Sequence, residues 1–282
     1  MIQTLHRVGS RLRHSHLLEE QRWLWEKLEP AWQRMFEQFS AQRGYPAHIN
    51  DDVFRLVYAY GARYDRADKR ANEPITYGAF VKDIKEGMTV FDIGAHVGFF
   101  TLAAAKRVGR SGRVFPFEPA PETLTILRQH ILFNNRADRV EVISSVVSDS
   151  DGITAFFANA DSMAASLRAE NWKFAAEHRP TPVLKIEVPS IRLDTFCKNR
   201  HVKPNVLKID VEGAELLVLR GAKELLNGDH LVIHCEVHPL LMKHFDYALA
   251  DFRAYLDDLN YQIEPLDDPN RMGIFHCRIT RR

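Results

Sequence analysis

The chain has 282 residues, of which 45% are hydrophobic, and a formal net charge of +1 at pH 7. This size and composition predict one large α/β domain with an appendage, and the balanced charge excludes a bulk electrostatic attraction to nucleic acid or to a membrane surface. Three widely spaced cysteines, and no apolar run suited to a membrane span or a signal peptide, predict a cytoplasmic protein without disulfides or stable membrane insertion.

Residues 1–50 are predicted to form a helical extension, and residues 51–282 the main domain. The apolar residues of the extension fall on a helical stripe, at Leu17, Leu18, Trp25, Leu28 and Trp32. A membrane-surface helix is the alternative. Glutamates lie among the basic residues, however, which favours packing against the main domain or a second subunit. A homo-oligomer formed through these helices is therefore one expected assembly.

From residue 88 onward, apolar runs of strand length alternate with segments of helical periodicity. Strands are expected at residues 88–93, 113–118, 140–146, 153–157, 183–188, 206–209 and 231–237, and finally at 261–265 and 273–279. Helices are expected at residues 98–108, 121–134, 214–226 and 240–259. This order predicts a doubly wound, mostly parallel sheet, with the closing pair of strands as an antiparallel hairpin on one edge.

The segment 90–98 predicts a strand, a glycine turn and the start of a helix, which together form a cleft for a small molecule. A dinucleotide fingerprint needs glycines at the first, third and sixth positions of the turn. The third position is His96, whose imidazole would obstruct a pyrophosphate. Asp92, followed by Gly94 and Gly98, instead suits a cofactor with an ammonium group and no phosphate. The turn therefore predicts S-adenosylmethionine, with its ammonium group held by Asp92.

Further polar residues are predicted around this cofactor. Glu118 ends the second strand, where it can accept both ribose hydroxyls, and its apolar neighbours disfavour a merely solvated glutamate. Asp149 follows the third strand and can accept the adenine amino group, with Ser148 near the ring, although an ordinary turn explains these two residues equally well. The first turn of the helix, with Thr101 nearby, can hold the methionine carboxylate through free N–H groups.

The next two parallel strands end in residues that can carry out acid–base chemistry. Asp210 directly follows the strand at 206–209, and Glu212 lies two residues later, so both are expected at the cleft. In the following strand His234, Glu236 and His238 share one face. This stripe invites a metal-site interpretation, but a zinc site needs three or four converging ligands and a proline ends the strand, so no metal site is predicted. His234 is expected to be a core residue.

These segments resemble the FkbM-type family of S-adenosylmethionine-dependent methyltransferases, over residues from about 81 to 239. The matching motifs occupy residues 91–101, 117–119, 190–195, 207–215 and 219–222. The resemblance implies a class I methyltransferase (Rossmann-like) fold with a seven-stranded sheet in residues 51–282. It also implies methylation of a hydroxyl on a sugar, a glycolipid or a polyketide-type natural product. The predicted cofactor-binding residues are Asp92, Gly94, His96, Gly98, Thr101, Glu118, Pro119, Ser148, Asp149 and Asp210.

The predicted activity is thus O-methyl transfer to a small-molecule or glycan hydroxyl. His238 or Asp210 is expected to act as the general base, oriented by Glu212 or Glu236. The chain has neither the Asn/Asp-Pro-Pro-aromatic motif of amino-directed nucleobase methylases nor a basic stripe with interleaved aromatics, so no nucleic-acid partner is expected. Two alternatives are an NAD-dependent dehydrogenase and a catalytically silent S-adenosylmethionine-binding scaffold.

Overall fold

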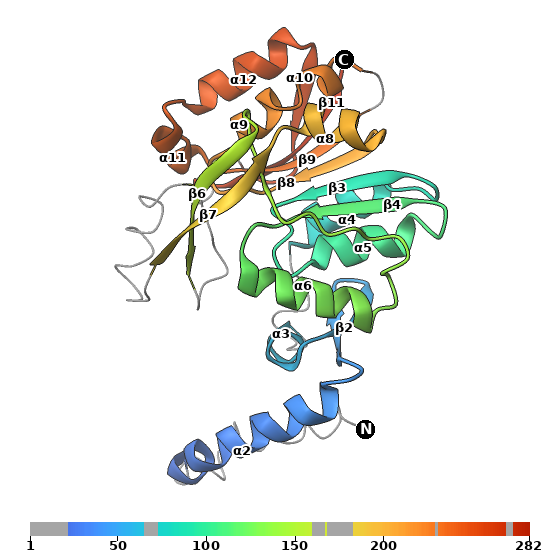
Figure 1. The fold of residues 1–282 in the computed structure, drawn as a ribbon, viewed down its shortest axis with the longest axis vertical. Helices are drawn as coiled ribbons and strands as arrows, with labels where there is room; N and C mark the ends of the chain where they lie inside the picture. The colour runs from blue at the N-terminus through green and yellow to red at the C-terminus, as the bar shows by residue number, and fades with distance from the viewer. Residues whose placement is uncertain (1–21, 65–72, 160–166, 168–182, 229–230, 269–272) are drawn as a thin grey trace. The chain divides into compact units, whose positions relative to one another are not determined.

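A computed structural model describes residues 22–64, 73–159, 167, 183–228, 231–268 and 273–282 (Figure 1). The chain divides into two compact units. The first consists of Met1–Asn72 with Gln129–Asn135, and the second of Glu73–Arg128 with Arg136–Arg282. The domain boundary predicted at residue 50 falls in the turn of a hairpin inside the first unit.

The described part of the first unit contains helix α2 (Arg22–Ser40), the antiparallel hairpin of β1 (Tyr45–Ile49) and β2 (Asp52–Leu56), and helix α3 (Tyr58–Tyr64). Phe36 of α2 stacks on Tyr58 of α3 with ring centroids 5.3 Å apart, and this contact joins the two helices. Leu28 and Phe39 of α2 are exposed. Assembly through the N-terminal helices stays a prediction, and the part of it that concerns residues 1–21 lies outside the described residues.

The second unit is built on a six-stranded sheet with the order β10-β11-β9-β8-β3-β4. Its parallel strands are β3 (Thr89–Ile93), β4 (Arg113–Phe117), β8 (Val206–Ile209) and β9 (Val232–Val237). β11 (Phe275–Arg281) is antiparallel to β9, and β10 (Tyr261–Pro265) is antiparallel to β11 at the edge. The predicted strand at 140–146 makes only two isolated parallel bridges to β4, through Val140 and Ile143, so the main sheet has six rather than seven strands among the described residues.

Helices lie on both faces of this sheet (Figure 1). On one face are α4 (Pro74–Asp83) and α5 (Phe99–Arg107), and α6 (Pro121–Phe133) follows β4. The other face carries α8 (Leu193–Arg200), α9 (Glu215–Arg220), α10 (Lys223–Leu226) and α12 (Leu249–Asp258). Short turns α11 (Pro239–Met242) and η2 (Lys243–Phe245) precede α12. This doubly wound arrangement around a mostly parallel sheet agrees with the predicted fold class.

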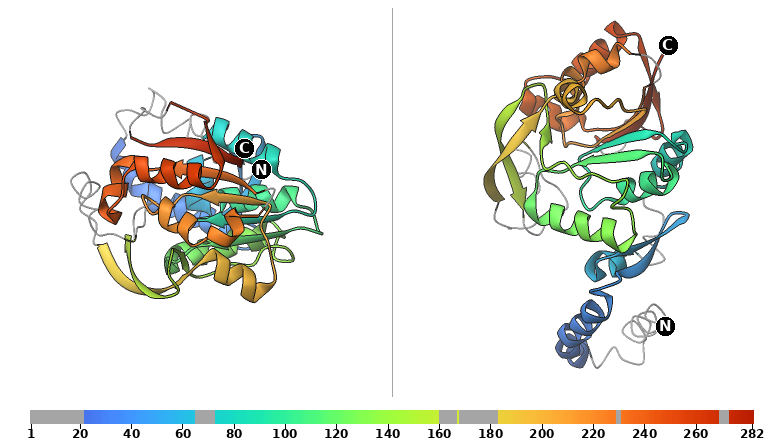
Figure 2. Two further views of the ribbon diagram at one scale, coloured as in Figure 1. Left: turned by 90° about the horizontal axis from the view of Figure 1, so that it is seen from above. Right: turned by 45° about the vertical axis from the view of Figure 1, so that its right-hand side comes forward.

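Two helices predicted as continuous are broken. The first is interrupted at Gly221, where a Cβ atom would lie 2.0 Å from the carbonyl oxygen of Ser148, so only glycine permits this close approach. The second is interrupted near Asp246, which adopts a left-handed conformation with φ 61°. A separate three-stranded sheet, with the order β5-β7-β6, contains β5 (Val146–Val147), β6 (Gly152–Asn159) and β7 (Val183–Ile191), as Figure 2 shows beside the main sheet.

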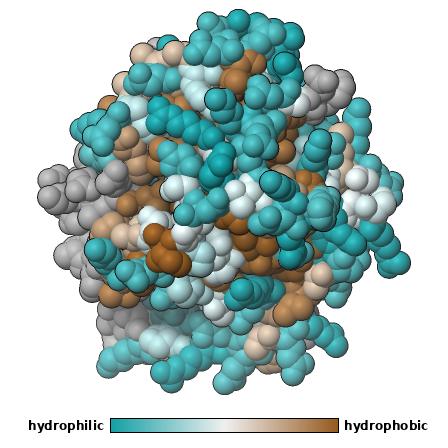
Figure 3. Space-filling model, turned by 45° about the horizontal axis from the view of Figure 1, so that its top comes forward, coloured by the Kyte–Doolittle hydropathy of each residue, from teal (hydrophilic) through white to brown (hydrophobic). Residues whose placement is uncertain are grey.

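Aromatic side chains fill the core between the sheet and α8. The rings of Phe91, Phe115 and Phe117 contact Phe196 of α8 at centroid distances of 5.0–5.6 Å, and all four side chains are buried. On the face shown in Figure 3, hydrophilic residues cover most of the surface and apolar residues show between them. No helix among the described residues combines the length and the apolar character that crossing a membrane requires.

Candidate functional site

Four parallel strands of the main sheet end at the same edge, and each is followed directly by a residue predicted to act in the site. Gly94 follows β3, Glu118 follows β4, Asp210 follows β8 and His238 follows β9. Since the carboxyl ends of parallel strands converge on one edge of a sheet, the topology brings these residues together. The candidate site is therefore a product of strand order.

The turn after β3 has an unusual backbone. Gly94 and Gly98 have φ values of 78° and 90°, and His96 between them has φ 50°, in the left-handed region that non-glycine residues seldom adopt. A Cβ atom on Gly94 would lie 1.8 Å from the carbonyl oxygen of Asp210, so the two loops are in direct backbone contact. The N–H of His96 donates a 2.9 Å hydrogen bond to Glu118 Oε2, which links the turn to the end of β4.

Asp92 is completely buried within β3. Its Oδ2 accepts a 2.5 Å hydrogen bond from the Thr101 hydroxyl, whereas Oδ1 has no hydrogen-bond partner among the described residues. Burial raises the pKa of Asp92, although Lys208 and Thr101 act in the opposite direction. A buried carboxylate oxygen without a partner is costly, so Oδ1 marks a place where a donor group is expected. Because its proton goes to Asp92, Thr101 positions that carboxylate and does not offer a free donor to a ligand.

Lys208 supplies the positive charge of the site, and the sequence analysis did not identify it. It pairs in register with Asp92 across β3 and β8, and its Nζ lies 2.8 Å from Asp210 Oδ2 and 4.9 Å from the centroid of the Phe100 ring. Burial alone would lower the pKa of Lys208, but the charges of Asp210, Asp92 and Glu236 outweigh it and raise the pKa, so the ammonium persists. The sequence did contain one indication of this role. A lysine within the apolar run 206–209 is expected to be buried, and a buried lysine usually has a charged partner.

Glu118 is buried at the end of β4, as expected for a residue with partners. Its Oε2 accepts the N–H of His96 and its Oε1 accepts the N–H of Ala120, both at 2.9 Å. Burial raises the pKa of Glu118 to about 7, against the lowering effect of these two hydrogen bonds. Each oxygen retains capacity for a second donor, so the carboxylate can accept two more hydrogen bonds.

The remaining predicted cofactor residues, Pro119, Ser148 and Asp149, differ in exposure. Pro119 is partly buried, Ser148 is buried at the end of β5, and Asp149 is exposed. The Ser148 hydroxyl donates a 3.3 Å hydrogen bond to Asp149 Oδ1. Their assignment to the cofactor stays a prediction, because an exposed turn explains Asp149 as well.

The loop after β8 places two carboxylates at the site and buries a third. Asp210 and Glu212 are partly exposed, and Glu212 adopts a left-handed φ of 51°. Burial and nearby negative charge raise the pKa of both groups, that of Glu212 to about 7. Glu215, which the sequence analysis did not place in the site, is fully buried and accepts the N–H of Gly213 at 3.0 Å. The Tyr247 hydroxyl holds the same loop by bonding the carbonyl of Gly213.

His238 is buried among carboxylates. Its Nδ1 lies 2.8 Å from Glu215 Oε1, and its Nε2 lies 3.5 Å from Glu236 Oε1 and 3.6 Å from Glu212 Oε2. Burial alone would lower the pKa of His238, but these carboxylates outweigh it and raise the pKa to about 12. The side chain is therefore an imidazolium at neutral pH.

Glu236 connects this group to a second histidine that the sequence analysis missed. His276 of β11 stands opposite Glu236 in the β9–β11 register, and its Nε2 lies 3.3 Å from Glu236 Oε2 and 3.4 Å from Glu73 Oε2. Its Nδ1 is bound by Asp267 Oδ2 at 2.6 Å. No local sequence motif predicts that His276 belongs to the site, because its position beside Glu236 depends on β11 lying between β10 and β9 in the sheet.

His234 does not join the cluster. Its Nε2 contacts Asp83 Oδ2 of α4 at 2.9 Å, and Arg278 contacts the same carboxylate oxygen at 2.7 Å. These bonds tie α4 to β9 and β11. His234 is thus a buried residue of the core, as the sequence predicted, and the metal-binding interpretation of one continuous stripe along β9 does not describe the geometry.

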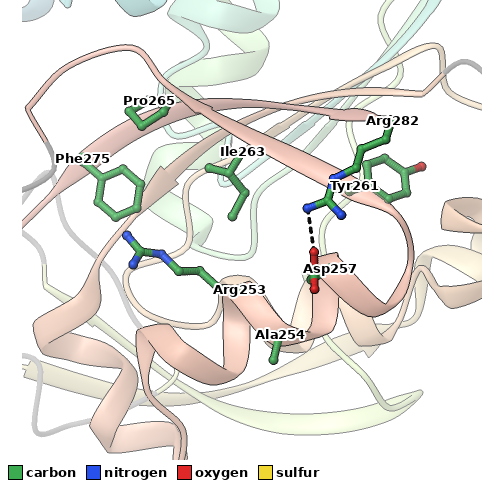
Figure 4. Close-up of a pocket in the computed structure, with 8 residues that line it drawn as sticks. All are labelled: Arg253, Ala254, Asp257, Tyr261, Ile263, Pro265, Phe275 and Arg282. Atoms are coloured by element: carbon green, nitrogen blue, oxygen red, sulfur yellow. Dashed lines mark hydrogen bonds and ion pairs between the residues drawn. The ribbon is translucent and has the colours of Figure 1, made fainter.

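A pocket of about 420 Å³ lies away from these residues, between α12 and the edge strands β10 and β11 (Figure 4). Tyr261, Ile263 and Phe275 contribute to its lining, and Asp257 bridges to Arg282 at 2.6 Å. None of the predicted site residues lines it. We therefore place the candidate site at the strand ends, where buried carboxylates can bind a cation and accept a proton.

Comparison with known proteins gives an independent result. A family model described as the methyltransferase FkbM domain matches residues 92–263, which is more than half of the chain. Methyltransferase sdnD of Sordaria araneosa is 28% identical over 157 residues, 48% of this chain and 60% of that protein. The 31-O-demethyl-FK506 methyltransferase FkbM of Streptomyces tacrolimicus is 29% identical over 210 residues, 66% of this chain and 77% of that protein.

A third relative, the hexuronic acid methyltransferase AglP of Haloferax volcanii, is 27% identical over 162 residues, 56% of this chain and 59% of that protein. The matched regions thus span 59–77% of the lengths of these three curated relatives.

The close backbone contact at the glycine turn gives a direct test of the site's construction. Gly94→Ala is expected to destabilise the protein by about 1–3 kcal/mol, because the new Cβ meets the Asp210 carbonyl and the positive φ becomes strained. Gly78→Ala in α4 is the matched control, since nothing lies within 4 Å of its added Cβ. Urea unfolding followed by circular dichroism measures both. Equal stability of the two variants would contradict the described turn.

Proposed function

The chain belongs to the FkbM methyltransferase domain family, and we propose that it is an S-adenosylmethionine-dependent O-methyltransferase acting on a small hydroxylated molecule. The observation that carries the proposal is the buried Asp92, whose Oδ1 has no hydrogen-bond partner among the described residues, beside a glycine turn with no room for a side chain. An anionic, tightly built crevice of this kind suits a cationic cofactor with an ammonium group.

The residues present fit this cofactor. Asp92 would receive the ammonium group, directly or through water, and Glu118 would accept the ribose hydroxyls with the lone pairs that its two backbone bonds leave free. Ser148 and Asp149 are proposed for the adenine end, and the backbone at Gly94 and after Gly98 for the methionine end. When bound, S-adenosylmethionine supplies a methyl group on a positively charged sulfur.

The acceptor hydroxyl must lose a proton, and the structure bears on which residue takes it. His238 and Asp210 were the candidate bases from sequence. His238 is an imidazolium held by Glu215, and Asp210 is bound by Lys208 at 2.8 Å. Glu212 Oε2 lies 3.6 Å from His238 Nε2, and its pKa of about 7 favours a group that accepts a proton near neutral pH. We therefore assign the base to Glu212, with His238 and Glu236 as positioning residues.

A sugar, a glycolipid or a polyketide-type alcohol is the proposed acceptor class. One relative is named for a hexuronic acid and another for 31-O-demethyl-FK506, which supports a hydroxylated acceptor. The family assignment and the side chain of His96 at the third position of the turn disfavour the NAD-dependent dehydrogenase. The catalytically silent scaffold is distinguished by turnover: incubation with labelled S-adenosylmethionine and a panel of sugars, glycolipids and macrolide alcohols is expected to yield a labelled methyl ether.

Removing the charge of Asp92 should weaken cofactor binding. Asp92→Asn is expected to raise the Kd for S-adenosylmethionine about 10- to 100-fold, because a charge-assisted hydrogen bond is worth about 1.5–3 kcal/mol. Isothermal titration calorimetry measures the change, with the exposed Asp257→Asn in α12 as control. Unchanged affinity in the Asp92 variant would remove the ammonium role.

Cofactor affinity should also depend on pH through Glu118. Its pKa of about 7 means that the carboxylate is largely protonated below neutrality and accepts ribose hydroxyls less well. Binding is therefore expected to tighten about tenfold as the pH rises from 5.5 to 7.5. Glu118→Gln should bind more weakly and lose this component of the pH dependence, whereas Glu122→Gln, on the exposed surface of α6, should retain it. Parallel pH profiles in wild type and Glu118→Gln would contradict the assignment.

The base assignment makes a separate prediction. Glu212→Gln is expected to lower kcat by about 10²- to 10⁴-fold while leaving the Kd for S-adenosylmethionine unchanged. The exposed Glu224→Gln in α10 is the control. If Glu212→Gln turns over normally, and His238→Gln folds and binds cofactor but is inactive, the base is His238.

A further inference from the structure

Two histidines of the second unit face the same glutamate in the same way. His238 and His276 each have Nδ1 fixed by a carboxylate, Glu215 for the first and Asp267 for the second. Their Nε2 atoms then point to opposite oxygens of Glu236, at 3.5 Å and 3.3 Å. Glu236 is thus placed between two oriented imidazoles.

The contacts at Nδ1 are shorter than the contacts at Nε2. The Nδ1 contacts, 2.8 Å and 2.6 Å, are hydrogen bonds. On the Nε2 side of His238, Glu236 and Glu212 stay at 3.5 Å and 3.6 Å, longer than charge-assisted hydrogen bonds. Donor atoms that each bind one ion at about 2.0–2.2 Å are separated by such distances along the edges of its coordination shell.

A third ligand completes the group around His238. Donor atoms of Asp210, Glu236 and His238 all lie within 4.8 Å of one another. The group combines the ends of β8 and β9, which is why the spacing along one strand did not reveal it. One imidazole and two carboxylates form a donor set that suits first-row transition cations.

The surroundings of His238 match those of a metal-binding histidine. Such histidines usually donate their second ring N–H to a carboxylate, which fixes the tautomer and directs the free nitrogen to the ion. Glu215 does this here: it is fully buried and is itself held by the N–H of Gly213.

We propose that Asp210, Glu236 and His238 bind one divalent transition-metal cation of the Mn²⁺ type. The proton on His238 Nε2 leaves to solvent when the cation takes its place. This goes beyond the proposed methyl transfer and departs from the expectation, based on sequence spacing, that no metal site exists.

A neighbouring group, Glu73, Glu236 and His276, also brings three donor atoms within 4.8 Å. Its members are all partly exposed, whereas His238 is buried and has the additional carboxylate of Glu212 beside it. We therefore assign the cation to the His238 group. Because Glu236 belongs to both groups, the two positions are distinguished by their other members, Asp210 and His238 against Glu73 and His276.

The test is a titration of the chelator-treated full chain with MnCl₂, with free Mn²⁺ measured by electron paramagnetic resonance, in the absence of S-adenosylmethionine and acceptor. One bound Mn²⁺ per chain is expected. Glu236→Gln and His238→Gln should each weaken binding at least about tenfold, and His276→Gln should not. A rise in the thermal unfolding temperature with Mn²⁺, lost in the first two variants, is the second readout.

Variants that fail to fold are replaced by Asp210→Asn, and folding is checked by circular dichroism. No binding by the wild type at millimolar Mn²⁺, or full binding by folded Glu236→Gln and His238→Gln, overturns the proposal. Loss of Mn²⁺ binding in His276→Gln alone also overturns it, because that result would assign the cation to the neighbouring group. Because neither substrate is present, each of these results is independent of whether methyl transfer occurs.

Discussion

The candidate site depends on keeping like charges close together inside the protein. Asp92 and Asp210 are held near each other at the ends of adjacent strands, and burial raises the pKa of both. Lys208 makes this arrangement possible, because its Nζ bonds Asp210 while its strand pairs in register with Asp92. Its aliphatic stem lies in the apolar sheet, and Phe100 covers the charged end. One buried cation thus stabilises the carboxylates on which the proposed chemistry rests.

The same principle is repeated on the other side of the site. Glu236 has its pKa lowered because the neighbouring rings of His238 and His276 and the charge of Lys208 outweigh the effect of burial. Positive and negative groups therefore alternate from β3 through β8 and β9 to β11. The apolar sheet and its helices supply the stability, and this alternation sets which carboxylates remain ionised and which hold a proton near neutral pH.

Local patterns in the sequence predicted the parallel strands, since each is a short run rich in apolar residues followed by a glycine, a carboxylate or a histidine. They also predicted Asp92, Glu118 and Asp210 at the strand ends, which follows from the topology of parallel sheets. Lys208 and His276 were missed for physical reasons. A lysine in an apolar strand has no meaning until its cross-strand partner is known, and His276 reaches Glu236 only through the strand order. The segment 140–146 makes only two isolated bridges to β4, which its local sequence pattern does not reveal.

The contact between Gly94 and the carbonyl of Asp210 joins the two halves of the crevice without any intervening side chain. The turn proposed for the methyl donor therefore lies directly against the loop that carries the proposed base, main chain to main chain. Neither backbone can shift toward the other without a clash. An acceptor that pushes the Asp210 loop toward Gly94 must therefore also move the turn that holds the donor. Under the proposed function, such a link makes the affinities of the two substrates mutually dependent, with the alignment of the reacting atoms set by main chain.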